Sequence, residues 1–355
     1  MKHAGLGHEL QLDLDRWRDA TSTRAAAFEA AIAERTSARH VIAVASPAMG
    51  FQIAFRAAGV PIGATVLTTS LADPSVARAT VGSGLQPRFV DIDLHGHLGA
   101  AAVRAHVALH GEPAVLVPSC FAGHPCDVDA VAAEAPHALL VEDATDALGG
   151  VRPDGRAVGS PNPATIAVLG IPAVRAAPAQ GAVLVTDDDL LADRVRRLRD
   201  ERGEHQLSEL HAALGLVQIG RLAEVVALRE SVAARYDAVV AGLALAEPVL
   251  PPAHARSAWA AYPLRVPAWL RPAVLEPLRA WGVGGHRLVM LLHRHPYLGR
   301  YADVLPAALP ATERFASEVV LLPTGSVSGD AEVTRVAGLL AATVGGGAER
   351  AHRAG

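Results

Sequence analysis

The sequence predicts an α/β protein with a doubly wound, mostly parallel seven-stranded sheet and a smaller C-terminal α+β domain. The first observation is an alternation of short aliphatic runs with helix-like stretches over the first half of the 355 residues. The second is that these runs are apolar at consecutive positions, as expected of strands covered on both faces. The third is a composition of 51% hydrophobic and 19% charged residues, which is enough apolar surface for a large core.

Each expected element has a local pattern that favours it. Residues 8–36 are rich in charge and alanine and predict a helix. Short aliphatic runs bounded by small or polar residues predict strands at 40–46, 64–70, 86–93, 114–119, 138–143, 165–171 and 181–187. The stretches between them predict helices at 48–58, 72–83, 99–109 and 127–134. Residues 187–241 are rich in arginine with periodic leucine, valine and alanine, which predicts further helices.

The C-terminal part of the chain differs in composition. Residues 246–259 are rich in proline and predict the entry to a second domain. In that domain strand-like AAYPLRV and EVVLLP alternate with helical patterns. We therefore expect a large domain at 1–240, a small domain at 241–345 and a disordered tail at 346–355.

Charge and composition exclude several classes of function. A net charge of -4 leaves no basic footprint for nucleic acid. No apolar run reaches the length of about 18 residues that spans a membrane, and the first residues lack the core of a signal peptide. Two cysteines do not make a disulfide scaffold, so we expect a cytoplasmic protein with free thiols. Lys2 is the only lysine, which removes most chemistry that needs an amine.

Three acidic residues, Glu142, Asp143 and Asp146, cluster at the end of the strand predicted at 138–143. In open α/β sheets, ligands bind outside the carboxyl ends of the strands. Carboxylates there bind a cation, a sugar hydroxyl or a protonated ring nitrogen. The alternative is a solvated turn in which these acids cap a helix.

Cys120 and Cys126 flank His124 in CFAGHPC, and thiolates with imidazole suit zinc. The spacing offers no second ligand pair, which structural zinc sites usually show. Buried cysteines acting as small apolar side chains explain the pattern better, so we expect no metal.

Two further segments of the sequence contain candidate functional residues. His286, His293 and His295 belong to GGHRLVMLLHRHPY, where imidazoles would serve as general bases near neutral pH. The commoner alternative is a surface segment rich in histidine and arginine. Residues 46–50, SPAMG, follow the first strand where a phosphate-binding loop would lie, although Pro47 removes one amide donor.

The order of motifs resembles the DegT-type sugar aminotransferases, which are fold-type-I pyridoxal-phosphate enzymes. LLVEDATDALGG is similar to the family's V-I-E-D-A-A-Q-A-x-G-A, and LSELHAALGLVQIGRL to its S-E-L-Q-A-A-x-G-L-x-Q-L. VPSCFAGHPCDVDAV resembles its G-x-P-x-D-x-D-A turn and helix, and residues 63–93 its strand–loop–helix–strand ending in V-D-I-D. The match spans about 40–340 and implies the large domain of aminotransferase fold type I, in a homodimer whose site lies at the interface.

The resemblance also implies where the catalytic lysine would stand. The family places it eight residues before the glycine that corresponds to Gly181, which is the position of Ala173. Pyridoxal phosphate needs an amine for its internal aldimine, and proton transfer at the substrate carbon uses the same amine as base. Alanine does neither, so we expect no bound cofactor and no transamination.

Other cofactor positions have changed as well. The glycine and threonine of the phosphate loop fall at Pro47 and Ala48, and a serine near the lysine falls at Val168. The resemblance leaves Asp143, which would pair with the pyridinium nitrogen, and Ser46 as remnants of cofactor binding.

Three functions stay open on this basis. In the first, the chain binds a sugar, nucleotide sugar or related biosynthetic intermediate without turnover, as a pseudoenzyme or as the partner of an active paralogue in a homodimer or hetero-dimer. In the second, it is a cofactor-independent enzyme with acid–base groups in the old cleft, the candidates being Asp143, Asp146, His124 and His293. In the third, it is a sugar aminotransferase or dehydratase that uses pyridoxal or pyridoxamine phosphate. The third ranks last because Lys2 is too far along the chain from the cleft.

Overall fold

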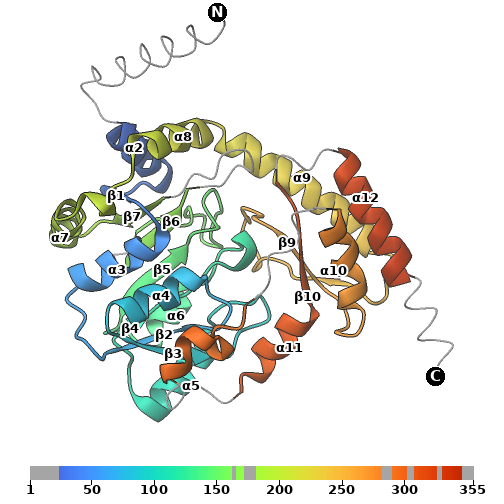
Figure 1. Ribbon diagram of the computed structural model, residues 1–355, viewed down its shortest axis with the longest axis horizontal. Coiled ribbons are helices and arrows are strands. Elements are labelled where there is room, and N and C mark those ends of the chain that lie inside the picture. The colour runs from blue at the N-terminus through green and yellow to red at the C-terminus, as the bar shows by residue number, and fades with distance from the viewer. Residues whose placement is uncertain are drawn as a thin grey trace, which may run out of the picture.

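The computed structural model describes residues 24–161, 165–171, 181–281, 290–301, 308–325 and 330–345. Within them lies a seven-stranded sheet of order β1-β7-β6-β5-β4-β2-β3 (Figure 1). Strands β2 to β6 pair in parallel with one another, whereas β7 is antiparallel to both β6 and β1. The predicted doubly wound, mostly parallel sheet is therefore confirmed.

Six of the seven strands of this sheet lie inside a predicted aliphatic run, and β5 extends one residue beyond the run predicted at 138–143. The strands are β1 (His40–Val44), β2 (Thr65–Thr69), β3 (Gln86–Val90), β4 (Val115–Leu116), β5 (Leu139–Ala144), β6 (Thr165–Gly170) and β7 (Ala182–Thr186).

Helices cover both faces of the sheet, which explains why its strands are apolar at consecutive positions. One face packs against α3 (Pro47–Ala57), α4 (Pro74–Gly82) and α7 (Asp189–Asp200). The other packs against α2 (Arg24–Thr36), α5 (Ala100–His110), α6 (Val128–Ala133), α8 (Glu209–Gly220) and the start of α9 (Leu222–Val240).

Most of these helices begin at a side chain that accepts a hydrogen bond from a first-turn amide, which satisfies a donor that the helix itself leaves free. The capping residues of α3, α4, α6, α7 and α8 are Ser46, Asp73, Asp127, Asp188 and Ser208. Pro47 and Pro74 follow two of them, at a position where proline's missing N–H costs no helical bond. These capping residues therefore determine where the five helices begin.

A second core surrounds a three-stranded antiparallel sheet of order β10-β9-β8. Its strands are β8 (Glu247–Pro248), β9 (Tyr262–Arg265) and β10 (Val319–Leu322). Side chains of α10 (Arg271–Ala280), α12 (Asp330–Leu340) and the second half of α9 fill this core. Figure 1 shows α9 running from α8 toward α12. Because α9 contributes to both cores, the domain boundary expected at 240 stays a prediction.

The remaining described elements are short or peripheral. They are α11 (Pro310–Glu318), a π-helical turn at Ala341–Gly345 and the 3-10 turns Phe121–Gly123, Gly203–His205, Leu292–Arg294 and Pro296–Tyr301. Among the described residues no single helix is both long and apolar enough to cross a membrane, although α8 and α9, bent by 62°, pass that test as a pair. The tail expected at 346–355 lies outside the described residues.

Candidate functional site

Three polar side chains stand next to one another at the carboxyl ends of β2, β4 and β5. β2 pairs with β4 through Leu67 and Leu116, and Ser70 and Ser119 each lie three residues beyond that pair, at the carboxyl ends of the two strands. Ser119 in turn forms a parallel bridge with Asp143. We call Ser70, Ser119 and Asp143 the polar row. It lies at the edge of the sheet where open α/β folds bind their ligands.

The polar row belongs to the face of the sheet that α3, α4 and α7 cover. Side chains alternate between faces along a strand, and Val117 and Val141, two residues before Ser119 and Asp143, pack in the core beneath these helices. The next strand continues the row with Val168, which pairs with Asp143 and is fully buried. The row is thus polar over three strands and apolar on the fourth.

Asp143 is a buried carboxyl group, 3% exposed. Its Oδ1 accepts hydrogen bonds from Thr145, at 2.7 Å from the hydroxyl and 3.3 Å from the amide. Burial raises the pKa of Asp143 to about 7, and the negative charge of Asp73 adds to this, while the hydrogen bonds from Thr145 oppose it. In the part of the chain that the structure describes, no cation pairs with this carboxyl group.

Asp73 brings a second carboxylate to the site. It is the N-cap of α4, and its Oδ1 accepts a 2.7 Å hydrogen bond from the amide of Ser75. Two carboxyl groups that share a site favour a ligand with positive charge or with hydrogen-bond donors, because each resists the ionisation of the other. Sugar hydroxyl groups are donors of this kind.

His293 reaches the polar row through Ser70. Its Nδ1 accepts the Ser70 hydroxyl at 2.6 Å, its backbone N–H donates to the same oxygen at 3.1 Å, and Nε2 donates to Glu313 at 3.0 Å. The pKa of Glu313 is lowered to about 2 by hydrogen bonds from Arg294 and His293. Hydroxyl, imidazole and carboxylate follow one another as in an activated nucleophile. Ser70 has no exposed surface, however, so we infer that this series of hydrogen bonds positions the polar row.

The other two acid–base candidates lie elsewhere. His124 is fully buried, donates from Nε2 to Val249 O at 2.9 Å and accepts the Ser257 hydroxyl at Nδ1 at 2.7 Å. Burial lowers the pKa of His124 to about 3, so it stays neutral and internally bonded near pH 7. Asp146 is partly exposed in the turn that follows β5. The structure therefore joins two of the four candidates, Asp143 and His293, around one row.

The start of α3 is the place where a phosphate would be held. Pro47 has no amide hydrogen there. The amide of Met49 donates to the Ser46 hydroxyl at 3.2 Å, and that of Gly50 donates to Ser46 O at 2.9 Å. The Met49 amide is therefore used within the helix, and Ser46 acts as a cap. Ala173 and His286 lie outside the described residues, as does Lys2.

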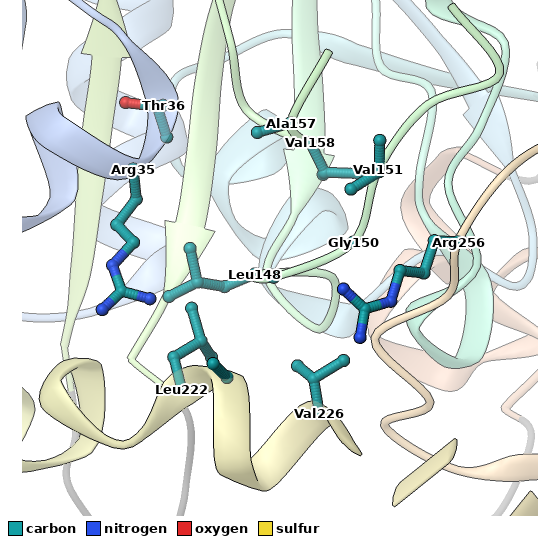
Figure 2. A pocket seen from close by; sticks show the side chains of 12 residues that line it. Arg35, Thr36, Leu148, Gly150, Val151, Ala157, Val158, Leu222, Val226 and Arg256 are labelled. Carbon is teal, nitrogen blue, oxygen red and sulfur yellow. The ribbon is translucent and has the colours of Figure 1, made fainter. Parts of the chain in front are cut away.

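A hollow of about 200 Å³ opens at a different place, between α2, the turn at 148–158 and α9. Figure 2 shows Leu148, Leu222 and Val226 around it, with Arg35 and Arg256 at opposite ends. Arg35 donates to Ile219 O at 2.9 Å, and Arg256 forms an ion pair with Glu230 at 2.6 Å. Both guanidinium groups are thus already bonded within the protein, so we assign no ligand to the hollow.

This fold is that of the fold-type-I aminotransferases. The solved structure of DesI in the presence of its TDP-sugar product is 30% identical, with a TM-score of 0.81 and coverage of 97% of this chain and 92% of that chain. The aminotransferase TlmJ from Streptoalloteichus hindustanus is 26% identical, with a TM-score of 0.83 and coverage of 98% and 97%. S. venezuelae DesV in complex with a ketimine intermediate is 25% identical, with a TM-score of 0.80 and coverage of 95% of both chains.

Residues 12–341 match the DegT/DnrJ/EryC1/StrS aminotransferase family. The chain belongs to this family, which confirms the resemblance stated from its motifs. The family covers nearly the whole chain, so both sheets are part of it.

Sequence reasoning missed four residues of the site: Ser70, Asp73, Ser119 and Glu313. Ser70 ends the run ATVLTTS, and Asp73 precedes a proline, which is a helix-start signal. Ser119 ends the run AVLVPS. Hydroxyl groups at the carboxyl ends of two predicted parallel strands were the signal that would have found the polar row.

Proposed function

We propose that this chain is a member of the DegT/DnrJ/EryC1/StrS family that binds a sugar or nucleotide-sugar intermediate at the polar row and does not transaminate. It acts in the cytoplasm, as a pseudoenzyme or as the partner of an active paralogue. The observation that carries the proposal is the lysine count, because the only lysine of the chain is Lys2. The resemblance of the motifs implies that Ala173 stands at the position of the Schiff-base lysine.

The fit of pyridoxal phosphate to the residues present supports the same proposal. Asp143 suits a protonated ring nitrogen, since a buried carboxylate is stabilised by a neighbouring positive charge. The start of α3 does not suit the phosphate, because Pro47 has no amide hydrogen and the amide of Met49 already donates to the Ser46 hydroxyl. With the amine absent as well, the donor set does not fit the cofactor, and we derive no step that uses it.

The first test is spectroscopic. Purified full-length protein incubated with excess pyridoxal phosphate and then desalted is expected to show no aldimine absorbance and no added mass, because no amine is placed to form the bond. An active family enzyme such as DesI is the positive control in the same buffer. Retained cofactor, or amino transfer from glutamate to a keto-sugar, would contradict the proposal.

The second test concerns the ligand. Replacing Asp143 with Asn is expected to weaken the binding of a TDP-sugar by about 10–100-fold, since hydrogen bonds to a charged group contribute about 1.5–3 kcal/mol. Isothermal titration calorimetry measures this. Asp154→Asn, in an exposed turn where Asp154 pairs with Arg156, is the matched control and should bind as the wild type does.

The calorimetric test also separates binding from turnover. Unchanged affinity in Asp143→Asn would remove the polar row from the proposal. Chemical conversion of the TDP-sugar by the wild type, lost in Asp143→Asn, would instead favour a cofactor-independent enzyme.

The proposed partnership draws support from α8. This helix reads ELHAALGLVQIG, and its Leu210 and Val217, seven residues apart, are 57% and 65% exposed. Residues seven apart share a helix face, so the two form an apolar stripe. A second copy of the chain or a paralogue would cover this stripe in the proposed dimer.

A further inference from the structure

Cys120, Cys126 and Glu142 form a buried cluster on the face of the large sheet opposite to the polar row. Alternation along β5 turns Glu142 away from Asp143, and Cys120 likewise points away from Ser119. Cys126 and Glu142 have no exposed surface, and Cys120 is 5% exposed. The two Sγ atoms lie 3.4 Å apart, and Sγ of Cys120 lies 3.8 Å from Oε1 of Glu142.

The second carboxylate oxygen of Glu142 is bound by a buried arginine. Its Oε2 pairs with the guanidinium of Arg152, which is 2% exposed and also donates to Ser160 O at 3.1 Å. Oε1 is thereby left facing the two thiols. Ligating carboxylates are commonly oriented by a hydrogen-bond donor on the oxygen that does not ligate.

We propose that Cys120, Cys126 and Glu142 bind a thiophilic divalent cation of the zinc class. Two thiolates and one carboxylate are zinc ligands, and the three ligand atoms lie within 4.8 Å of one another. Zinc–sulfur bonds of about 2.3 Å set the two sulfurs of a tetrahedral site about 3.8 Å apart, close to the observed separation. These three residues leave one position of a tetrahedral site for a further ligand.

Charge balance favours this cluster as a cation site. Binding converts two neutral thiols into two thiolates and releases two protons to solvent. The thiolates and the Glu142 carboxylate then carry three negative charges, which the cation and the guanidinium of Arg152 balance. A buried site that is neutral overall avoids the cost of an uncompensated charge.

The loop between the cysteines holds them in place without an ion. Ala122 has φ 55° and Gly123 has φ 85°, so the chain turns sharply between Cys120 and Cys126. A Cβ on Gly123 would lie 2.6 Å from Ala260 N, so the loop packs closely against the neighbouring backbone at this point. A disulfide would need the sulfurs to approach to about 2.05 Å, and a fixed loop resists that movement.

The experiment titrates Cd²⁺ into full-length protein that has been purified under reducing conditions and treated with a chelator. We expect about one Cd²⁺ per chain by elemental analysis after dialysis, a cadmium–thiolate absorption band, and release of about two protons per ion. Zn²⁺ should displace the band. Cys120→Ser and Cys126→Ser are each expected to weaken binding more than about 100-fold, since even partners outside the coordination sphere change affinity by about 10–100-fold.

The matched control is His137→Ala, which removes an exposed histidine paired with Glu112 and should leave the titration unchanged. The proton release and the thiolate band are measured on wild type, so the test stands even if a cysteine variant fails to fold. A wild type that holds no cadmium after dialysis would overturn the proposal. A Cys120–Cys126 disulfide that remains after purification under reducing conditions would also overturn it.

Discussion

Replacing Arg152 with Met is expected to lower the free energy of unfolding by about 3–5 kcal/mol, because it leaves the buried Glu142 carboxylate without its cation. Burial already raises the pKa of Glu142, and the guanidinium opposes that rise. Without Arg152 the carboxyl group binds a proton more readily, so the loss should be larger at pH 8 than at pH 6. Urea denaturation with a chelator present measures both values.

An exposed ion pair provides the matched control. Arg104 of α5 pairs with Glu134, and its side chain is 69% exposed. Arg104→Met should therefore change the free energy of unfolding much less than Arg152→Met does. Adding Glu142→Gln to Arg152→Met should recover part of the loss, since no buried charge then remains. If Arg152→Met were as stable as Arg104→Met, the pair would not carry the energy assigned to it.

Most of the large sheet was predictable because its strands are buried on both faces. Runs such as HVIAVAS and GAVLVTD are apolar at successive positions, which only a doubly covered strand requires. Their ends were less predictable. The run at 114–119 predicts six strand residues, whereas β4 has two, because Pro118 has no N–H to donate to the ladder.

The acidic cluster at 142–146 shows what a linear pattern hides. Glu142, Asp143 and Asp146 were expected to act together. Alternation along β5 instead places Glu142 with Arg152 on one face and Asp143 with Ser119 on the other. One cluster in the sequence thus becomes two sites in the fold, one on each side of the sheet.

The polar row could not be read from the sequence for a different reason. Its members Ser70 and Ser119 are ordinary strand-end residues until the pairing of β2 with β4 brings the carboxyl ends of these two strands side by side. His293, which bonds to Ser70, lies 223 residues after it in the sequence. Glu313, which bonds to His293, lies 243 residues after Ser70. Only a helix of the C-terminal part packed against the large sheet brings these groups together.

Lowering the pH from 7.5 to 5 is expected to cost the protein about 4 kcal/mol of unfolding free energy through two buried histidines. Burial lowers the pKa of His97 and that of His124 to about 3, and positive charge on neighbouring histidines adds to the effect. In the unfolded chain both titrate near 6.5. Stability from neutral imidazoles is therefore complete above about pH 6.5 and falls as the pH drops toward 3, by about 2 kcal/mol for each at pH 5. Urea denaturation at pH 7.5, 6 and 5 measures it.

A variant separates these histidines from the many carboxylates that also titrate in acid. His97→Leu puts an apolar side chain of similar volume into a site that is 2% exposed, so it should remove about half of the pH dependence between 7.5 and 5. His254→Asn, at an exposed position with φ 65° that asparagine tolerates, should leave the dependence unchanged. A loss of packing in His97→Leu lowers the free energy of unfolding equally at every pH. It therefore does not change the slope against pH, which is the quantity compared. A slope in His97→Leu equal to that of the wild type would show that burial does not keep this imidazole neutral.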